Sequence, residues 1–412
     1  METPEEMQSP APRRRPAGAQ AAKKAGAVRR PRTGKPTKGK KKKKRKLRSP
    51  AMRLLRALML ILSIASAVAT IFTAYSGHIS PLKHGGFWGI FPLCFPICLL
   101  CSVILIVLQV WWHWRGVIIT AIGLVASAAP ALQICPLHLG TPKAPEGSDT
   151  FTLLTYNVLN LNDRRDSTDV APNHTIDYII DQDADIVCLQ EAANVTVSRH
   201  SFVTAEQIRT LHERYPYIIT SSGAQTIMSK FPVQPIHLTL TKEEFDDAEL
   251  AAYRISFPGG KSATLFNVHL QSFSLTKTDR ELYRNLTDLQ RESIQDVRTH
   301  LIHKLSVANV ERARQAQVLM RLIRHYGGPD VIICGDFNDV ATCYAIRTIE
   351  DAGFRSVYAS LGFGPIATYN ENRFYFGIDH ILYRGSIVPL TIDKGTVRCS
   401  DHYPLKATLA ID

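Results

Sequence analysis

The sequence lacks a cysteine framework. Its 412 residues include eight cysteines, and their spacings match neither a zinc site nor a disulfide-rich domain. Cys94, Cys98 and Cys101 lie in an apolar run, and Cys188 and Cys334 lie in predicted core strands, where cysteine behaves as a small hydrophobic residue. The cysteines therefore argue against a metal- or disulfide-stapled fold and leave the redox compartment undecided.

The chain also lacks a basic surplus where a globular domain is expected. The net charge is +13. Residues 1–56 hold 20 Lys and Arg against three acids, which gives this segment +17 and leaves −4 for the rest. The main body is therefore slightly acidic, and its composition shows no basic face of the kind that nucleic-acid-binding domains use.

Large apolar side chains are nearly absent from residues 1–50. A segment this rich in Pro, Ala, Gly and Lys cannot bury enough surface to offset its ordering entropy, so we expect a disordered basic tail. The run Lys40–Lys46 (KKKKKRK) fits contact with anionic lipid or nucleic acid, but it also fits a signal that only fixes membrane topology. We favour the second interpretation, because the run lies directly before an apolar segment.

Charged residues are absent from three long stretches. Ala57–Tyr75 has none over 19 positions, Phe87–Trp112 none over 26 and Val117–Cys135 none over 19. A helix needs about 20 apolar residues to cross the hydrocarbon core, so the stretches predict a transmembrane region. The expected boundaries are 51–136 for the region and about 52–75, 87–112 and 116–135 for its spans.

The flanking charges predict how this region is oriented. The basic tail should stay cytoplasmic, so three crossings place everything after Cys135 on the far side of a membrane, which we take to be the inner membrane. Pro92 and Pro96 make the second span irregular, and a re-entrant path is an alternative there. A cleaved signal peptide fits poorly, because two more apolar stretches follow the first. Residues 137–149, rich in Pro and Gly, are expected to be a linker.

From residue 150 onward, strand and helix signals alternate. Strands are expected at residues 151–159, 185–190, 226–229, 235–240, 251–257, 263–270, 331–334, 378–383 and 405–411. Helices are expected at residues 173–181, 204–215, 278–326 and 344–352, the third of them broken near 303–306. Strands outnumber helices, and both hairpin-like and crossover spacings occur. Residues 150–412 are therefore expected to form an α/β domain with mixed sheets.

The stretch Val331–Val340 (VIICGDFNDV) combines a buried strand with a polar end. Its apolar residues do not alternate with polar ones, which is typical of a strand buried on both faces. Gly335 lets the backbone turn, and Asp336 and Asn338 follow at the carboxyl end, where the ligand sites of α/β folds gather. Taken alone, the stretch equally fits a strand that ends in an Asx turn.

Further polar residues lie where other predicted strands begin or end. They are Asn157, Gln190, Glu191, His269, Asp379, Asp401 and His402. Each has a structural alternative, as a turn residue, a solvated strand end or a buried core histidine. The feature that distinguishes a functional set from these structural alternatives is the order of the residues along the chain, which runs N, QE, H, GDFN, D, SDH.

This order resembles that of the endonuclease/exonuclease/phosphatase family. The motifs TYNV, LQE, NVHLQS, GDFN, IDHI and SDHYPL follow the family's order over about residues 151–412, and IMSKFP resembles the family's strand that ends in Ser-Arg/Lys. The resemblance implies an α/β fold, a four-layer sandwich of two mixed β-sheets flanked by helices, here preceded by about three transmembrane helices. It implies an enzyme that hydrolyses a phosphodiester or phosphomonoester.

The resemblance also implies a divalent metal. Glu191 would be its principal ligand, with Asn157 and Asp401 close by. Hard oxygen ligands suit Mg²⁺ or Mn²⁺ and do not suit zinc. The phosphoester substrate stays open among nucleic acid, phospholipid head groups and inositol-type phosphates, because the shared residues grip only the phosphate. Membrane lipid is the other expected partner, and no obligate protein partner is evident.

The remaining implied roles are catalytic. Asp336 would orient or deprotonate the attacking water, and Asn338 would bind a phosphate oxygen. His402, paired with Asp379, would be cationic and would stabilise charge on the transition state. His269 would contact the phosphate from the other side or assist the leaving group.

Two other interpretations stay open. The first is a catalytically inactive membrane-anchored binding or scaffold protein on the same fold, although Glu191, Asp336 and His402 are all present. The second is a nucleic-acid tether with the basic tail as its working part. His380 departs from the expected apolar type and is given a structural role. A set of arginines in the long helical stretch is interpreted as a solvated face rather than a substrate lid. These are Arg280, Arg284, Arg291, Arg298, Arg312 and Arg314.

Overall fold

The computed structural model describes most of the chain after residue 48. The described residues are 49–163, 172–192, 195, 203–221, 224–241, 244, 249–273, 294–371 and 375–412, with only the backbone given for 294–300. Residues Pro50–Asp412 form one compact unit. The predicted basic tail, apart from its last two residues, and the predicted helix from 278 to 293 lie outside the described residues.

Two six-stranded sheets form the body of the described chain after residue 148. The first sheet has the order β11 (Ile387–Lys394), β12 (Leu405–Ile411), β1 (Asp149–Asn157), β2 (Ile186–Gln190), β4 (Thr226–Ser229) and β3 (Tyr217–Thr220). The second has the order β5 (Val233–Ile236), β6 (Glu249–Ser256), β7 (Ser262–His269), β8 (Val331–Asp336), β10 (Asp379–Arg384) and β9 (Arg355–Ser356). β1 pairs with β2 in parallel, as β7 does with β8, and the other neighbours are antiparallel, so both sheets are mixed as predicted.

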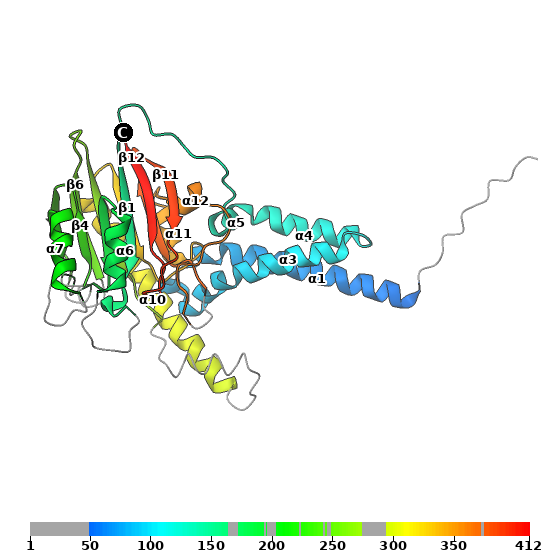
Figure 1. Cartoon of the computed structure of the whole chain (residues 1–412). Coiled ribbons are helices and arrows are strands. Elements are labelled where there is room, and N and C mark those ends of the chain that lie inside the picture. The colour runs from blue at the N-terminus through cyan, green and yellow to red at the C-terminus, as the bar shows by residue number, and fades with distance from the viewer. Residues whose placement is uncertain are drawn as a thin grey trace, which may run out of the picture. The chain divides into compact units, whose positions relative to one another are not determined.

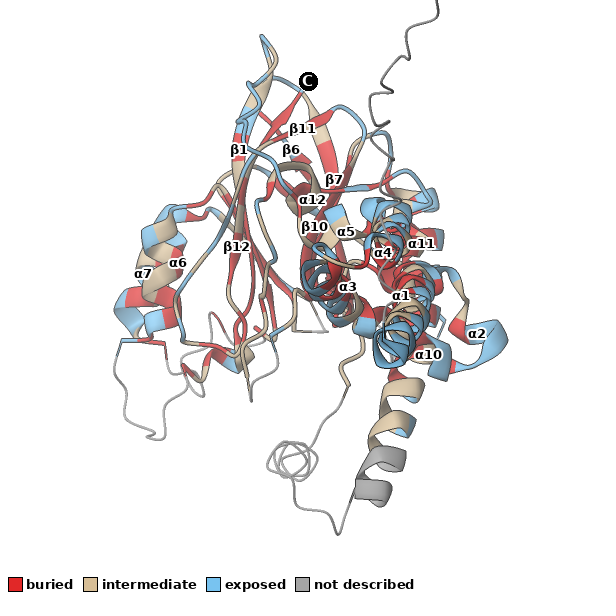
Figure 2. Ribbon diagram, turned by 90° about the vertical axis from the view of Figure 1, so that its right-hand side faces the viewer, coloured by how far each residue is buried: buried red, intermediate tan, exposed pale blue. Residues whose placement is uncertain are grey.

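The sheets pack face to face because their central strands are apolar on both sides. In β1, Leu153 lies in the core between the sheets and its neighbour Leu154 lies under the outer helices. Helices α6 (His174–Gln182) and α7 (Ala205–Arg214) cover the first sheet, and α10 (Ile294–Tyr326) and α11 (Tyr344–Glu350) cover the second (Figures 1 and 2). The predicted four-layer α/β sandwich is confirmed.

The helix boundaries follow local capping. The Asn173 side chain accepts a hydrogen bond from Ile176 N at the start of α6. Thr204 and Gln207 form a capping box at the start of α7. The break predicted near residues 303–306 is wrong, because α10 is continuous there. Ser306, at the end of that stretch, packs closely against Gly86, because a Cβ on Gly86 would overlap Ser306 O.

Before the sandwich lies a bundle of apolar helices. Its elements are α1 (Pro50–Tyr75), η1 (Ser76–His78), α2 (Pro81–His84), η2 (Gly86–Cys94), α3 (Phe95–Gln109), α4 (Trp114–Ala126) and α5 (Ala128–Ile134). Among the described residues, two helices are long and apolar enough to cross a membrane, Pro50–His78 and Gly86–Gln109. The third predicted span is α4 followed by α5, bent by 64°. Pro130 stands in the first turn of α5, a position where its missing N–H does no harm to a new helix.

Small and polar residues hold the bundle together. Ser102 of α3 hydrogen-bonds the hydroxyls of Ser66 and Thr70 of α1 at 2.7 and 2.8 Å, and Gly123 of α4 packs against Ala67 of α1. Large apolar side chains face outward, Leu100 for example being 60% exposed. An apolar outer face with small and polar residues inside is typical of membrane-associated helices.

The bundle contacts the sandwich directly. The Asn309 side chain of α10 donates to Gly86 O at 3.0 Å, and Gln133 of α5 donates to Glu350 of α11 at 2.9 Å. The predicted linker 137–149 begins with a β-bridge from Leu137 to Phe363. The apolar region and the sandwich are therefore packed against each other rather than joined only by a tether.

Candidate active site

The candidate residues meet where strand ends of both sheets converge. Asn157 closes β1 and Glu191 follows β2, and these two strands are parallel neighbours. In the second sheet, His269 at the end of β7 is in register with Asp336 at the end of β8. Asp379, at the start of β10, pairs with Asp336 from the other side. The register of the strands therefore brings together residues that lie far apart in the sequence.

Two buried amides join the sheets beneath this convergence. Gln190 Nε2 donates to Asn267 Oδ1 at 2.7 Å, and Asn267 Nδ2 donates to Leu189 O at 3.0 Å. Both side chains have no exposed surface. Asn267 was not predicted from the sequence, where its only signal was a polar residue within the mostly apolar strand ATLFNVH.

Asp336 is the hub of the cluster. Asn157 Nδ2 donates to its Oδ2 at 3.1 Å, and the ring nitrogens His402 Nε2 and His269 Nε2 lie 3.5 and 3.7 Å from the same oxygen. Burial raises the pKa of the Asp336 carboxyl, the charge of His402 opposes that rise, and nearby Asp379 adds to it. A carboxylate so placed can accept a proton from a bound water.

Asn338 is fixed beside Asp336 in the left-handed backbone region, at φ 50°. Its backbone N–H donates to Asp336 Oδ1 at 2.8 Å, and its Nδ2 donates to Leu270 O at 2.9 Å. The first of these bonds is the Asx-type turn that the sequence offered as a structural alternative. The turn and a functional role are compatible, because the turn is what holds both side chains in the cluster.

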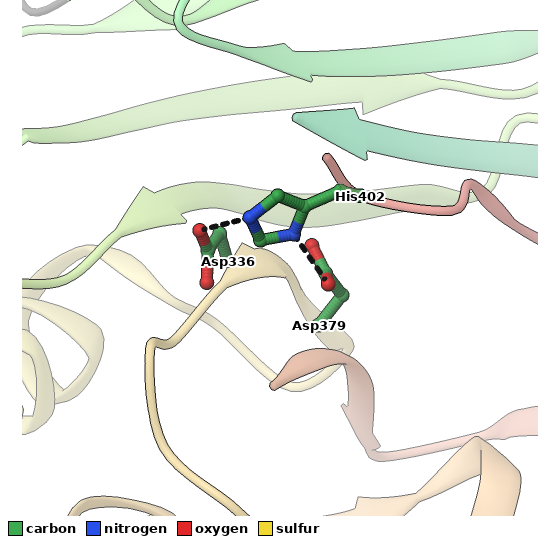
Figure 3. Close-up of side chains that lie close together, drawn as sticks. All are labelled: Asp336, Asp379 and His402. Carbon is green, nitrogen blue, oxygen red and sulfur yellow. Dashed lines mark hydrogen bonds and ion pairs between the residues drawn. The ribbon is translucent and has the colours of Figure 1, made fainter. Parts of the chain in front are cut away.

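His402 lies between two carboxylates, as Figure 3 shows. Its Nδ1 is 2.8 Å from Asp379 Oδ2, and its Nε2 faces Asp336. Burial alone would lower the pKa of His402, but Asp379 and Asp336 outweigh it and raise that pKa to about 10. The imidazole is therefore cationic at neutral pH and held in one orientation.

His269 has a carboxylate partner of its own, Glu249, which was not predicted from the sequence. Its Nδ1 lies 2.6 Å from Glu249 Oε2. Burial lowers the pKa of His269, but the hydrogen bond to Glu249 and the charge of Asp336 raise it to about 9. Glu249 is the cross-strand partner of His269 in the β6–β7 pair, so the signal for it was the register of that hairpin.

Glu191 and Asp401 lie at the rim of the cluster. Glu191 Oε1 accepts from Asn157 Nδ2 at 3.0 Å. Asp401 lines the same cavity as Glu191, and its neighbour Ser400 donates to Asn157 O at 2.8 Å, which ties this loop to the end of β1. The donor atoms are carboxylate and amide oxygens, which fit a hard divalent cation.

The cluster Asp336, Asp379 and His402 also has ligand atoms within 4.8 Å of one another. Both ring nitrogens of His402, however, already face a carboxylate oxygen (Figure 3). When both ring nitrogens are protonated, Nδ1 donates to Asp379 and the charged ring forms an ion pair with Asp336. This trio is therefore better described as an acid–histidine chain joined by one hydrogen bond and one ion pair, and the rim residues Glu191, Asn157 and Asp401 as the group that fits a metal.

All these side chains lie in or beside one cavity of about 550 Å³. Its polar end contains Glu191, His269, Asp336, Asn338, Asp401 and His402. The rest of its lining is largely apolar. A volume of this size takes a ligand far larger than a phosphate ion.

The predicted role of His380 is confirmed, whereas the predicted exposure of Arg312 is wrong. His380 is structural as predicted, because its buried Nε2 lies 2.9 Å from Asp339 O and burial lowers its pKa. Arg312 is not part of a solvated face, and that prediction is wrong. Its side chain is fully buried, stacks on Phe273 with its guanidinium carbon 4.2 Å from the ring centre, and lies 3.6 Å from Asp339 Oδ1. Arg314 is exposed beside Glu311 as predicted, and the arginines at 280, 284, 291 and 298 lie outside the described side chains.

The comparisons with known proteins give one family match and a set of solved structures with a similar fold. The model of the Endonuclease/Exonuclease/phosphatase family matches residues 154–402. A solved family protein from Bacteroides thetaiotaomicron is 17% identical, with a TM-score of 0.41, over 64% of this chain and 99% of that one. The 2′,3′-cyclic phosphatase ANGEL2 is 16% identical, with a TM-score of 0.43, over 66% and 99%. Truncated TDP2 from Caenorhabditis elegans is 18% identical, with a TM-score of 0.39, over 63% and 97%. No curated protein matches the chain.

Proposed function

The chain belongs to the endonuclease/exonuclease/phosphatase family, and from this premise we propose that it is a membrane-anchored, divalent-metal-dependent phosphoesterase. The apolar region 51–136 serves as the anchor, residues 137–149 connect it, and residues 150–412 carry the reaction. The substrate is a phosphodiester or a phosphomonoester.

The proposal rests on one observation, the convergence of polar side chains on Asp336. Two histidines and two amides, from both sheets, surround one buried carboxylate. An anionic acceptor between two cationic imidazoles suits a reaction in which water loses a proton while charge grows on a phosphoryl group. A purely structural cluster has no need of this arrangement at the polar end of a cavity.

The chain's own residues divide the work. Asp336 orients the attacking water and takes its proton as the water oxygen bonds to phosphorus. Asn338 donates to a non-bridging oxygen, and cationic His402, held by Asp379, stabilises the charge on the phosphoryl group. The phosphorus–oxygen ester bond then breaks, and the leaving oxygen is protonated by His269. A divalent cation bound by Glu191, Asn157 and Asp401 would supply further charge neutralisation.

The proposal is tested with the full chain purified in detergent. With Mg²⁺, it should hydrolyse at least one member of a panel of phosphoesters, including bis(p-nitrophenyl) phosphate, DNA, RNA, phospholipids and inositol phosphates. Excess chelator should abolish turnover, and full turnover without metal would exclude the proposed metal group. An intact fold that binds these ligands without hydrolysing any of them would favour the scaffold alternative.

Glu191→Gln is the matched variant for the metal. It should lower the affinity for Mg²⁺, measured from the metal dependence of the rate, because an amide is a weaker ligand than a carboxylate. The melting temperature should change little, since the apolar body of β2 is untouched. A melting temperature reduced as far as in a core truncation would make Glu191 a structural residue instead.

A further inference from the structure

The active-site cavity is polar at one end and apolar at the other. The apolar end is formed by Ile90 and Leu93 of η2, Leu301 and Leu305 of α10, and Phe376. Ile90 and Leu93 belong to the segment Gly86–Gln109, one of the two helices apolar enough to cross a membrane. The membrane region therefore provides part of the wall of the reaction site.

This wall is held in place by close packing between helices. A Cβ on Gly89 would lie 2.6 Å from the Asn309 side chain, and one on Gly86 would overlap the backbone of Ser306. The absence of side chains at these glycines lets η2 and α10 approach each other closely. Leu93 and Leu305 consequently face one cavity from two elements that are fixed to each other.

The charges of the described cavity lining do not favour a polyanion. None of the described residues that line it is Lys or Arg. Arg312, the nearby guanidinium, is fully buried and already faces Asp339. Nucleic acids are bound largely through cationic contacts to the phosphates that flank the reacting one. The described lining instead fits a single phosphoester joined to an apolar group.

A second, smaller cavity lies beside the first and is also lined by residues of the helix bundle. It measures about 360 Å³ and shares Val340 and Phe376 with the first. Its far wall is formed by Leu99, Leu100 and Val103 of α3. Leu100 and Val103 are 60% and 46% exposed on the outer face of the bundle. Val340 and Phe376 therefore separate the active-site cavity from a second apolar cavity, whose lining includes the exposed face of α3.

We propose, building on the proposed function, that the substrate is a membrane lipid whose phosphoester enters the polar end while its hydrocarbon chain lies against Leu93, Leu305 and Phe376. The shared chemistry is a phosphoester on a lipid backbone. The phosphate is either a diester that carries a head group or a terminal monoester, and the two are separated by the test.

The test uses the full chain in a phosphate-free maltoside detergent with Mg²⁺. Two substrate series are compared, one of phosphodiester lipids and one of phosphomonoester lipids, each with acyl chains of four, six and eight carbons and a chain-free glycerol analogue. DNA and RNA oligonucleotides complete the panel. In one of the lipid series, kcat/KM should rise by about two- to fourfold for each buried methylene. The responding series identifies the ester class.

A matched pair of variants separates the cavity from partitioning into micelles. Leu305→Asn places an amide in the apolar wall, and Val307→Asn makes the same change two residues along α10 at a side chain that is 56% exposed and outside the described cavities. Leu305→Asn should lower kcat/KM about tenfold more for the eight-carbon lipid than for the chain-free analogue. Val307→Asn should keep the wild-type profile, because micelles affect both variants equally.

The outcomes are distinct. A flat dependence on chain length, the same dependence in Leu305→Asn as in wild type, or oligonucleotides cleaved faster than the longest lipid would overturn the lipid proposal and leave the phosphoesterase intact. Hydrolysis of no phosphoester at all would overturn the phosphoesterase, and the lipid proposal with it.

Discussion

Asp336, His402 and Asp379 act through one another at the scale of single residues. The distances of 2.8 Å from Asp379 to His402 and 3.5 Å from His402 to Asp336 join three ionisable groups into one chain. His402 owes its raised pKa to both carboxylates, which outweigh the opposing effect of burial. Removing one member therefore changes what the others contribute.

The first prediction concerns this coupling. His402→Ala should slow the chemical step by roughly two to four powers of ten, because the cation that stabilises the transition state is lost. Asp379→Asn should also slow it strongly, and the double variant should be little worse than His402→Ala alone, since groups that act as a unit are not additive. Single-turnover rates normalised to folded protein provide the measurement.

Additive losses would show that Asp379 and His402 work independently. Near-native turnover per folded molecule, together with a lower melting temperature, would make His402 a structural residue at the entry to β12.

The second prediction concerns Glu249 as a positioning residue for His269. Glu249→Gln keeps a hydrogen-bonding group at Nδ1 and removes the charge, so kcat should fall about tenfold while KM changes less. The NMR shifts of the His269 ring nitrogens should report a weaker hold on the proton. Glu206→Gln is the control, because Glu206 forms only a surface ion pair with Arg209 within α7, one of the helices on the outer face of the first sheet. Equal kinetics in the two variants would remove Glu249 from the site.

The order of the motifs along the sequence identified the site residues that lie at the ends of apolar strands. It did not identify Glu249, because the importance of this residue depends on its pairing with His269 across a hairpin. Arg312 was misjudged for a related reason. Its spacing among acids fits a solvated helix, and only the packing against Phe273 shows that the guanidinium is buried.

At the scale of elements, periodicity predicted the buried strands and missed the edge strands β3, β9 and β11. β4 and β12 have the predicted boundaries, and each has an unbroken apolar or alternating face. β11 was missed because it is an edge strand that contains Pro389 and a register shift beside it. β3, also at an edge, is only four residues long. The third membrane span was predicted as one helix, and the bend after Ala126 divides it.

The third prediction tests the contact between η2 and α10. Gly86→Ala should lower the free energy of unfolding by about 1–3 kcal/mol, because its Cβ meets the backbone of Ser306 and one helix must move. Gly140→Ala is the control, since nothing lies within 4 Å of the added Cβ. Thermal or denaturant unfolding of the full chain in detergent gives the measurement. Equal stability of the two variants would show that the helices can separate freely.

At the scale of the whole molecule, α1 follows the basic tail in the chain and ends beside a contact with the sandwich. Its 26 residues extend over about 39 Å as a helix, enough to cross a bilayer. Near its start, Arg56 donates to Trp112 O at 2.9 Å. Just beyond its end, Gly77 packs so closely on the sandwich that an added Cβ would overlap Thr342 O. Arg56 and the contact with the sandwich therefore lie near opposite ends of this helix.

The last prediction follows from this arrangement. If α1 spans the membrane, the tail and residues 150–412 face opposite sides whether or not the bent pair α4 and α5 forms a full crossing, because both ends of α1 are fixed by contacts. Positive charge at the start of α1 places the tail in the cytoplasm. A reporter that works only outside the cytoplasm should be active when fused after Asp412 and inactive when fused before Met1. A cytoplasmic reporter should show the reverse. Cytoplasmic activity at both ends would mean that α1 lies along the membrane surface instead of crossing it.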